Sequence, residues 1–246
     1  MEQRGTAAYV AEFIGTFLLV FFIGVILTDN SPFGLGPTDF AVIGLLHAFV
    51  LAMLIATLGP TSGGHFNPAV TVTLATLRKI SPRDAVPYLV AQLAGGVAAA
   101  LVVKVMLSSP ADAVNYGATG INDKLIPSKG AAFLAEAIGT FTLMWAIMGA
   151  AVHPRGDRHW APWIIGITLG FVVMATGPLT GAGINPARAF GPALVGDAFN
   201  GGGTFVFVYI LGPIVGALVA GFGFEAAILR PAHLDPGVRP IDTLRE

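Results

Sequence analysis

Two short segments of this sequence carry residue types that can bind or orient a small polar molecule. Asn67-Pro68-Ala69 and Asn185-Pro186-Ala187 each join an asparagine to a proline and a small apolar residue. An asparagine caps a helix well and a proline is tolerated at the first helical position, so each pair marks a helix start. The N-terminal end of a helix carries partial positive charge. Each segment therefore offers side-chain amide donors beside a positive helix end.

The composition of the chain indicates that these segments belong to a membrane protein. Of the 246 residues, 54% are apolar and 11% are charged, whereas a soluble protein has roughly 25% charged residues. The mean hydropathy of +0.77 leaves too little polar surface for a soluble globule. A net charge of −1 without a basic cluster argues against a nucleic-acid partner. The chain has no cysteine, which excludes disulfides, thiolate metal sites and cysteine nucleophiles.

Six segments are long and apolar enough to cross a bilayer as helices, which takes about 20 residues each. They are Thr6–Leu27, Phe40–Leu58, Ala85–Val103, Gly130–Val152, Trp160–Leu179 and Thr204–Leu229. Two further apolar pieces, Asn67–Leu77 and Asn185–Val195, have 11 residues each and are too short to span. We predict that both are re-entrant helices. Both termini then lie on the side that holds nine lysines and arginines against three, which predicts a multi-pass cell-membrane protein with cytoplasmic termini.

The sequence repeats itself across its two halves. Ala11–Phe17 recurs as Ala135–Phe141 at an offset of 124 residues. Asn67–Val70 recurs as Asn185–Arg188 at an offset of 118 residues. Each half holds three spans and one short segment, and an odd number of spans turns the second half upside down relative to the first. We therefore predict one domain over residues 1–246, built from inverted repeats over about 6–107 and 130–229 and followed by a tail over 231–246.

Glycine-rich backbone precedes each asparagine. Irregular backbone at membrane depth is stable only where it lines a cavity or packs within protein. We therefore expect a row of free carbonyl oxygens on each side of the membrane midplane. The residues expected to supply them are Gly63, Gly64, His65, Gly181 and Gly183.

The sequence resembles the aquaporin, or major intrinsic protein, family, and within it the bacterial or archaeal members. The resemblance rests on the doubled Asn-Pro-Ala box, the doubled Ala-Glu-x-Ile-Gly-Thr-Phe motif and the six spans. The resemblance runs from about Ala8 to Leu229. It implies an all-α membrane fold of six transmembrane helices plus two re-entrant half-helices. It also implies a homotetramer with one passive pore per subunit, without enzymatic activity, cofactor or bound metal.

The resemblance further implies roles for four polar residues. Asn67 and Asn185 donate amide hydrogens to the passing molecule, and Glu12 and Glu136 hold the re-entrant loops by accepting backbone hydrogen bonds. Two positive half-helix ends at one midplane oppose cations, hydronium included. Asparagine donors at that point force a passing water to present its oxygen, which breaks the alignment of a proton wire. Neutral molecules meet neither barrier.

In the family, four positions form the narrow outer constriction of the pore. Their distances in sequence from the two asparagines identify the matching residues of this chain. They are His47, Val173, Ala182 and Arg188. This quartet departs from strict water channels and from glycerol facilitators, and it resembles that of plant vacuolar (tonoplast) intrinsic proteins, which pass water with ammonia or urea. Ala189 and Ala193 resemble water-type channels, whereas Tyr209-Ile210 resembles channels that admit larger neutral solutes. We therefore predict a passive channel for water and small neutral solutes such as ammonia, urea or glycerol.

Three other classes of protein compete with this prediction. Inverted repeats and broken helices also serve secondary transporters, whose coupling site here would have to be Glu12 or Glu136. A junction or scaffold protein would keep the fold and conduct poorly. An intramembrane enzyme is disfavoured because no serine–histidine or paired-aspartate arrangement occurs in the spans.

Overall fold

The computed structural model describes residues 4–30 and 37–230, and the predicted tail over 231–246 lies outside them. Within these residues the elements are helical, and no strand occurs. The helices are α1 (Thr6–Asn30), α2 (Pro37–Ser62), α3 (Pro68–Thr76), α4 (Pro82–Asp112), α5 (Lys129–Ile147), α6 (Ala161–Thr180), α7 (Pro186–Val195), α8 (Gly202–Phe205) and α9 (Gly212–Phe224). Wider π-helical turns over Met148–Val152, Val206–Leu211 and Glu225–Leu229 extend α5, join α8 to α9, and extend α9.

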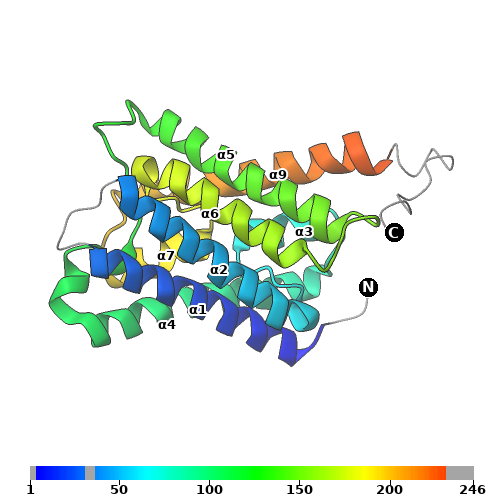
Figure 1. Ribbon diagram of the computed structural model, residues 1–246, viewed down its shortest axis with the longest axis horizontal. Coiled ribbons are helices and arrows are strands. Elements are labelled where there is room, and N and C mark those ends of the chain that lie inside the picture. The colour runs from blue at the N-terminus through cyan, green and yellow to red at the C-terminus, as the bar shows by residue number, and fades with distance from the viewer. Residues whose placement is uncertain (1–3, 31–36, 231–246) are drawn as a thin grey trace.

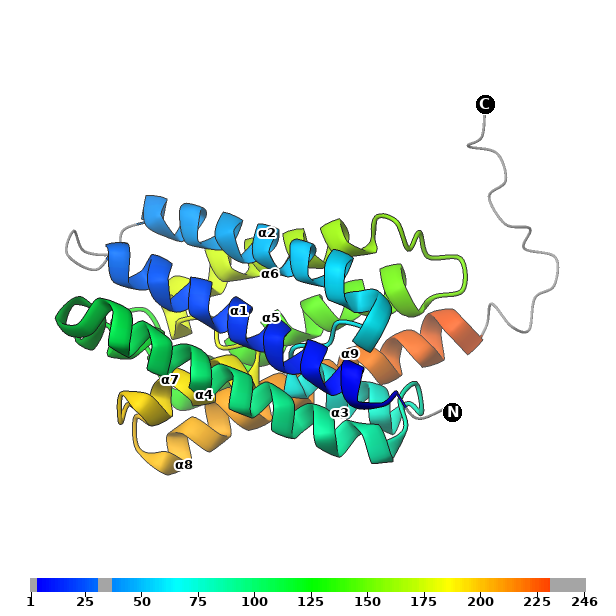
Figure 2. The ribbon, with the colours of Figure 1, turned by 90° about the horizontal axis from the view of Figure 1, so that it is seen from below.

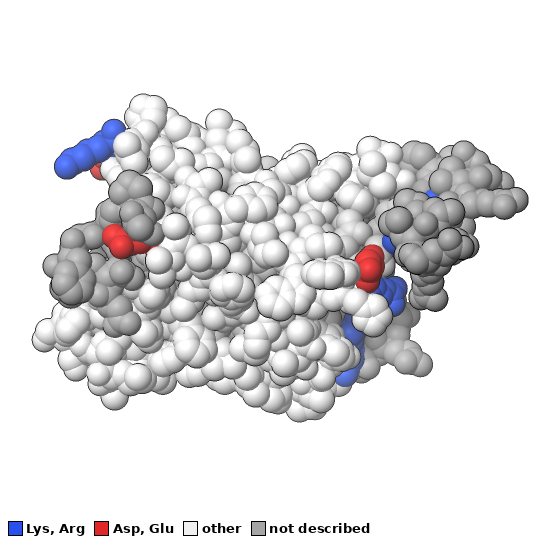
Figure 3. Space-filling view, viewed as in Figure 1, with Lys and Arg blue, Asp and Glu red and all other residues white. Residues whose placement is uncertain are grey.

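Among the described residues, six helices are long and apolar enough to cross a membrane. They coincide with the six predicted spans, with α8, α9 and the turns between and after them forming the last one, Gly202–Leu229. Charged residues visible on one face lie near the two ends of the bundle and leave an uncharged band between them (Figure 3). The predicted class, an all-helical membrane protein with six spans, is confirmed.

The spans lie side by side along the long axis of the molecule (Figure 1). α1 packs on α4, α2 on α6 and α5 on α9 (Figure 2). Glycines allow the closest approach: a Cβ atom added to Gly166 would collide with the carbonyl of Ala48, and one added to Gly170 with the carbonyl of Gly44. The Gly-x-x-x-Gly pattern in α6 therefore serves helix packing.

The short helices α3 and α7 lie between the spans, toward opposite ends of the bundle (Figures 1 and 2). We call the end where α1 begins and Glu225–Leu229 ends the terminal end, and the opposite one the distal end. α3 lies toward the terminal end and α7 toward the distal end.

One boundary differs from the prediction. The sequence predicts a span that ends at Val103, but α4 continues to Leu107, breaks at Ser108, where φ is 43°, and resumes as a short helical segment to Asp112. The unbroken part of α4, from Pro82 to Leu107, is about 39 Å long at 1.5 Å per residue, which exceeds the roughly 30 Å of a bilayer core. The length that a membrane requires therefore underestimates how far this helix extends.

Candidate functional site

Both short helices begin at the predicted asparagines, which act as N-caps. The Asn67 side chain accepts a hydrogen bond from the backbone N–H of Ala69 at 2.9 Å. The Asn185 side chain accepts bonds from Ala187 at 3.0 Å and from Arg188 at 3.4 Å. A proline follows each cap, where its missing N–H leaves no hydrogen bond unmade.

The amide groups of the two asparagines connect the two halves of the chain. The asparagine that starts α3 bonds to the backbone before α7, and the asparagine that starts α7 bonds to the backbone before α3. Asn67 Nδ2 donates to the carbonyl of Ile184 at 3.1 Å. Asn185 Nδ2 donates to the carbonyl of Phe66 at 2.7 Å. Phe66 and Ile184 have φ values of 48° and 55°, a left-handed conformation that is rare for such bulky residues. Each amide nitrogen carries two hydrogens, so one remains for another acceptor.

Glu12 holds the glycine-rich backbone before α3. Its carboxylate accepts hydrogen bonds from the backbone N–H of His65 at 2.9 Å and of Phe66 at 2.7 Å. The hydroxyl of Ser62 at 2.7 Å and the amide of Gln92 at 2.8 Å also donate to it. Glu12 is fully buried, so these four donors replace the water that an ionised carboxylate needs.

Glu136 makes the corresponding contacts before α7. It accepts bonds from the N–H of Gly183 at 2.8 Å and of Ile184 at 2.5 Å, and from the hydroxyl of Thr180 at 2.6 Å. The three donors lie 118 residues after the corresponding donors to Glu12. The contacts of both glutamates agree with the loop-bracing role expected of them.

Two tyrosines, whose bonds to the backbone the sequence does not predict, add a further matching pair of contacts. Tyr88 Oη donates to the carbonyl of Ser62 at 2.7 Å. Tyr209 Oη donates to the carbonyl of Thr180 at 2.9 Å. Both tyrosines are fully buried, and they lie 121 residues apart. Their separation lies between the two repeat offsets of 118 and 124 residues, so a search for identical residues within that range would have found them.

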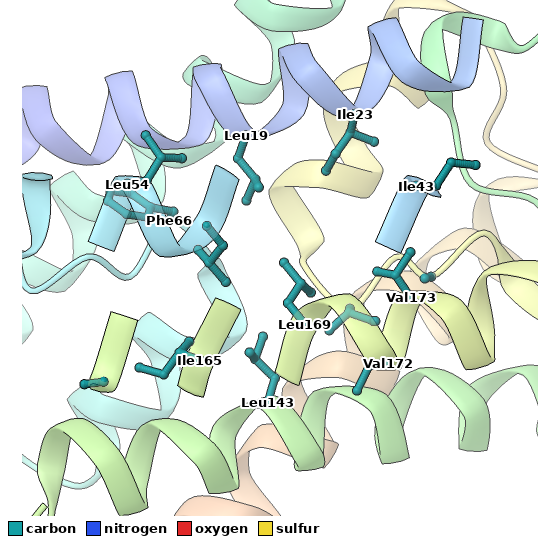
Figure 4. Packing of buried hydrophobic residues seen from close by; sticks show 14 of the residues in the cluster. Leu19, Ile23, Ile43, Leu54, Phe66, Leu143, Ile165, Leu169, Val172 and Val173 are labelled. Carbon is teal, nitrogen blue, oxygen red and sulfur yellow. The ribbon is translucent and has the colours of Figure 1, made fainter. Parts of the chain in front are cut away.

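A narrow central cavity of about 30 Å³ runs past both asparagines. A cavity needs roughly 10–15 Å³ to hold one water, so this one has room for about two or three. Polar side chains on its wall are His47, His65, Asn67, Asn185 and Arg188. The apolar part of its wall consists of Leu19, Ile23, Leu51, Ile55, Phe66, Val70, Leu143, Ile147, Ile165, Leu169 and Ala182. Leu19, Leu143 and Leu169 come from three different helices and point toward this common space (Figure 4).

A wider distal cavity of about 270 Å³ adjoins the first. His47 and Arg188 line both cavities, whereas Val173 lines only the distal one and Ala182 only the central one. The predicted quartet therefore lies together where the two cavities meet. All four side chains are at most 3% exposed.

The five residues expected to supply carbonyl oxygens lie along the same path with one exception. Gly64, His65 and Gly183 line the central cavity, and Gly181 lines the distal one. Gly63 lines neither of these two cavities.

The family profile described as major intrinsic protein matches residues 2–224. This chain belongs to the major intrinsic protein family. Aquaporin AqpM of Methanothermobacter thermautotrophicus is 38% identical over 240 residues, which cover 89% of this chain and 96% of that protein. Glycerol uptake facilitator protein-like 6 of Lactiplantibacillus plantarum is 36% identical over 218 residues, which cover 87% and 94%.

The fold is similar to that of the aquaglyceroporin from Plasmodium falciparum, solved by X-ray crystallography. The TM-score is 0.76 at 23% identity, and the match covers 93% of this chain and 99% of that one. Family membership confirms the predicted class of a passive channel for water and small neutral solutes. This major intrinsic protein is a channel and not an enzyme.

In this major intrinsic protein, His47 and Arg188 differ in what they offer a passing molecule. His47 Nδ1 lies 2.7 Å from the carbonyl of Ile43. A carbonyl only accepts, so Nδ1 carries the hydrogen and Nε2 of the neutral ring is an acceptor. Arg188 donates from Nη1 to the carbonyl of Gly117 at 2.7 Å, and its buried Nε has no protein partner. The junction of the two cavities thus combines an acceptor with an unused donor.

Proposed function

We propose that this major intrinsic protein conducts water together with small neutral solutes such as ammonia, urea or glycerol. The path runs through the distal cavity, past His47 and Arg188, and along the central cavity. The observation that carries the proposal is the pair of amide bonds that join Asn67 to Ile184 and Asn185 to Phe66. These bonds hold both asparagines on the wall of the central cavity, each with one amide hydrogen to spare.

Proton and cation exclusion follows from the same two residues. α3 and α7 start at Asn67 and Asn185, so the positive ends of both helices meet at one depth of the pore. A cation at this depth is repelled by both ends. A water that accepts hydrogens from the asparagines presents its own hydrogens away from them, which interrupts a chain of aligned waters.

The quartet sets the solute range at the junction of the cavities. Arg188 donates hydrogen bonds and adds a second cation barrier, and His47 accepts them. Val173 and Ala182 add apolar surface to the same junction and fill less space than the aromatic residues of narrower filters. A small neutral solute with both donors and acceptors fits this combination.

The assembly and the location in the cell belong to the same proposal. We place both termini in the cytoplasm, because the terminal end carries most of the lysines and arginines. The protein spans the cell membrane as a homotetramer with one pore per subunit. Each subunit is one domain of two inverted repeats, and the equivalent bonds of Glu12 and Glu136 support the repeat.

Stopped-flow light scattering on proteoliposomes tests the proposal directly. We expect water permeability well above that of protein-free vesicles, and permeability to at least one of ammonia, urea and glycerol. Leu169→Trp fills the central cavity and abolishes both fluxes. The matched control is Leu211→Trp, because Leu211 is 45% exposed on the outside of the bundle. Water flux without solute flux would refute the solute range, and absence of both from assembled protein would refute the function.

A further inference from the structure

The two halves of the chain make equivalent contacts at an offset of 118 residues. Ser62 and Thr180 obey this offset, as do the backbone groups of Phe66 and Ile184. Applied to the quartet at the distal side, the offset leads to a second set of four positions. His47 corresponds to Ile165, Val173 to Ile55, Ala182 to Gly64 and Arg188 to Val70. We call Ile55, Gly64, Val70 and Ile165 the inner set.

All four residues of the inner set line the central cavity. They come from three different parts of the fold: α2, the backbone before α3 together with α3 itself, and α6. Ile165 and Val173 are eight residues apart on α6, which corresponds to about 12 Å along a helix. They lie at opposite ends of the packed cluster around the pore (Figure 4). The inner set thus surrounds the path on the terminal side of the asparagines.

The chemistry of the inner set is the opposite of that of the quartet. An isoleucine replaces the imidazole, and a valine replaces the guanidinium. The remaining polar side chains on the terminal side of this cavity are His65 and Asn67. His65 Nδ1 lies 3.1 Å from the hydroxyl of Thr71, so that nitrogen is already engaged. A water between Ile55, Val70 and Ile165 therefore meets no side-chain donor or acceptor on those three sides. Its remaining partners are the backbone carbonyls expected at Gly64 and His65 and the second ring nitrogen of His65.

We propose that Ile55, Val70 and Ile165 form a second, apolar constriction that limits the rate of water passage. It acts on hydrogen bonding, because three of the residues around a water there offer no hydrogen-bond partner, whereas the quartet acts on charge and size. Apolar constrictions oppose the entry of water in this way. The inference rests on the proposed function, because it concerns the rate at which the channel conducts water.

The test adds one hydroxyl to the constriction without changing its size. Val70→Thr exchanges a methyl group for a hydroxyl on the cavity wall. The matched control is Val72→Thr on the same helix, at a position outside the lining of this cavity. In stopped-flow measurements we expect the water permeability per assembled channel to rise roughly fivefold in Val70→Thr, the factor for about one net hydrogen bond. We also expect the activation energy for water flux to fall in Val70→Thr. In Val72→Thr the water permeability and the activation energy should both equal those of the wild type.

Ile165→Thr provides the same test from α6 if Val70→Thr does not assemble, and it should also raise the water permeability. The proposal is overturned if assembled Val70→Thr or Ile165→Thr conducts water no faster than the wild type. It is also overturned if Val72→Thr gives the same increase. A wild-type protein without water flux defeats the proposed function itself, whereas normal wild-type flux with unresponsive variants defeats only the apolar constriction.

Discussion

Arg188 donates a hydrogen bond of 2.7 Å from Nη1 to the backbone carbonyl of Gly117, which lies 71 residues earlier in the chain. This bond connects the quartet to the loop between α4 and α5. Gly117 has a φ of +86°, and a Cβ atom placed on it would press against Gly24 of α1. The loop therefore packs tightly against α1, and this packing holds the carbonyl of Gly117 where Arg188 can bond to it.

Gly117→Val should release the guanidinium of Arg188. The added side chain is strained at this φ and displaces the loop from α1, so the charged donor loses a hydrogen bond worth about 1.5–3 kcal/mol. We expect the ratio of urea to water permeability to rise in reconstituted vesicles. The control is Gly202→Val at the start of α8, where a Cβ atom meets open space outside both cavities and the ratio should not change. An unchanged ratio in both variants would contradict a role of the loop in placing Arg188.

Glu136→Gln should destabilise the protein strongly. The new amide nitrogen cannot accept a hydrogen bond, so at least one buried donor among Thr180, Gly183 and Ile184 stays unpaired. Each such donor costs about 1–3 kcal/mol. Thermal unfolding of the purified protein in detergent should therefore begin at a clearly lower temperature than in the wild type.

The control for this variant removes a carboxylate from a partly exposed ion pair. Glu225 forms an ion pair of 3.2 Å with Lys79, and the two side chains are 23% and 36% exposed. Glu225→Gln should cost less than about 1 kcal/mol because solvent already screens this pair. Equal melting temperatures of the two variants would mean that Glu136 does not hold the backbone before α7.

The double variant His47→Phe with Val173→His should narrow the junction of the two cavities. It places an aromatic ring on α2 and another on α6, at positions that are 3% and 2% exposed. The permeability to urea and glycerol should fall relative to water by roughly tenfold or more, as expected when a pocket loses the space of a methylene group. Water flux in the same vesicles serves as the internal reference. If the ratio of urea or glycerol permeability to water permeability stays at the wild-type value, these residues do not form the filter.

Mercuric ion should not block the wild-type channel through a thiol, because the chain contains no cysteine. Leu143→Cys should make the channel sensitive, since Leu143 lines the narrow central cavity. The control is Val105→Cys, whose position is 81% exposed on α4. Water flux should stop on addition of mercuric chloride only for Leu143→Cys and return with a reducing agent. Reversible block of the wild type would contradict this prediction.

Much of the architecture could be predicted from the sequence because a bilayer imposes a length and a polarity on each element. The six apolar runs predict the six spans, and the two 11-residue pieces predict α3 and α7. Glu12 and Glu136 stood out as carboxylates within apolar segments, and the resemblance to the family implied their loop-bracing role. The repeated motifs also indicated that the two halves are equivalent.

The tertiary structure alone decided which groups meet. The bond between Arg188 and Gly117 depends on where a loop between two spans folds, and no local signal in the sequence predicts that contact. The left-handed φ of Phe66 and Ile184 is equally invisible to residue propensities, since both residue types disfavour it. It arises because the carbonyl of each must turn toward the asparagine of the other half.

The apolar side of the pore was the least predictable part. Leu19 and Leu143 face the central cavity, whereas Leu134 and Ile138 are 58% and 62% exposed on the outside of the bundle. All four are aliphatic residues in spans, because lipid, protein interior and this pore wall are similarly apolar surroundings. In a soluble protein the polar side of a helix reveals which way it faces. In these spans hydrophobicity carries no such information, so only the packing of the helices determines which aliphatic side chains line the path.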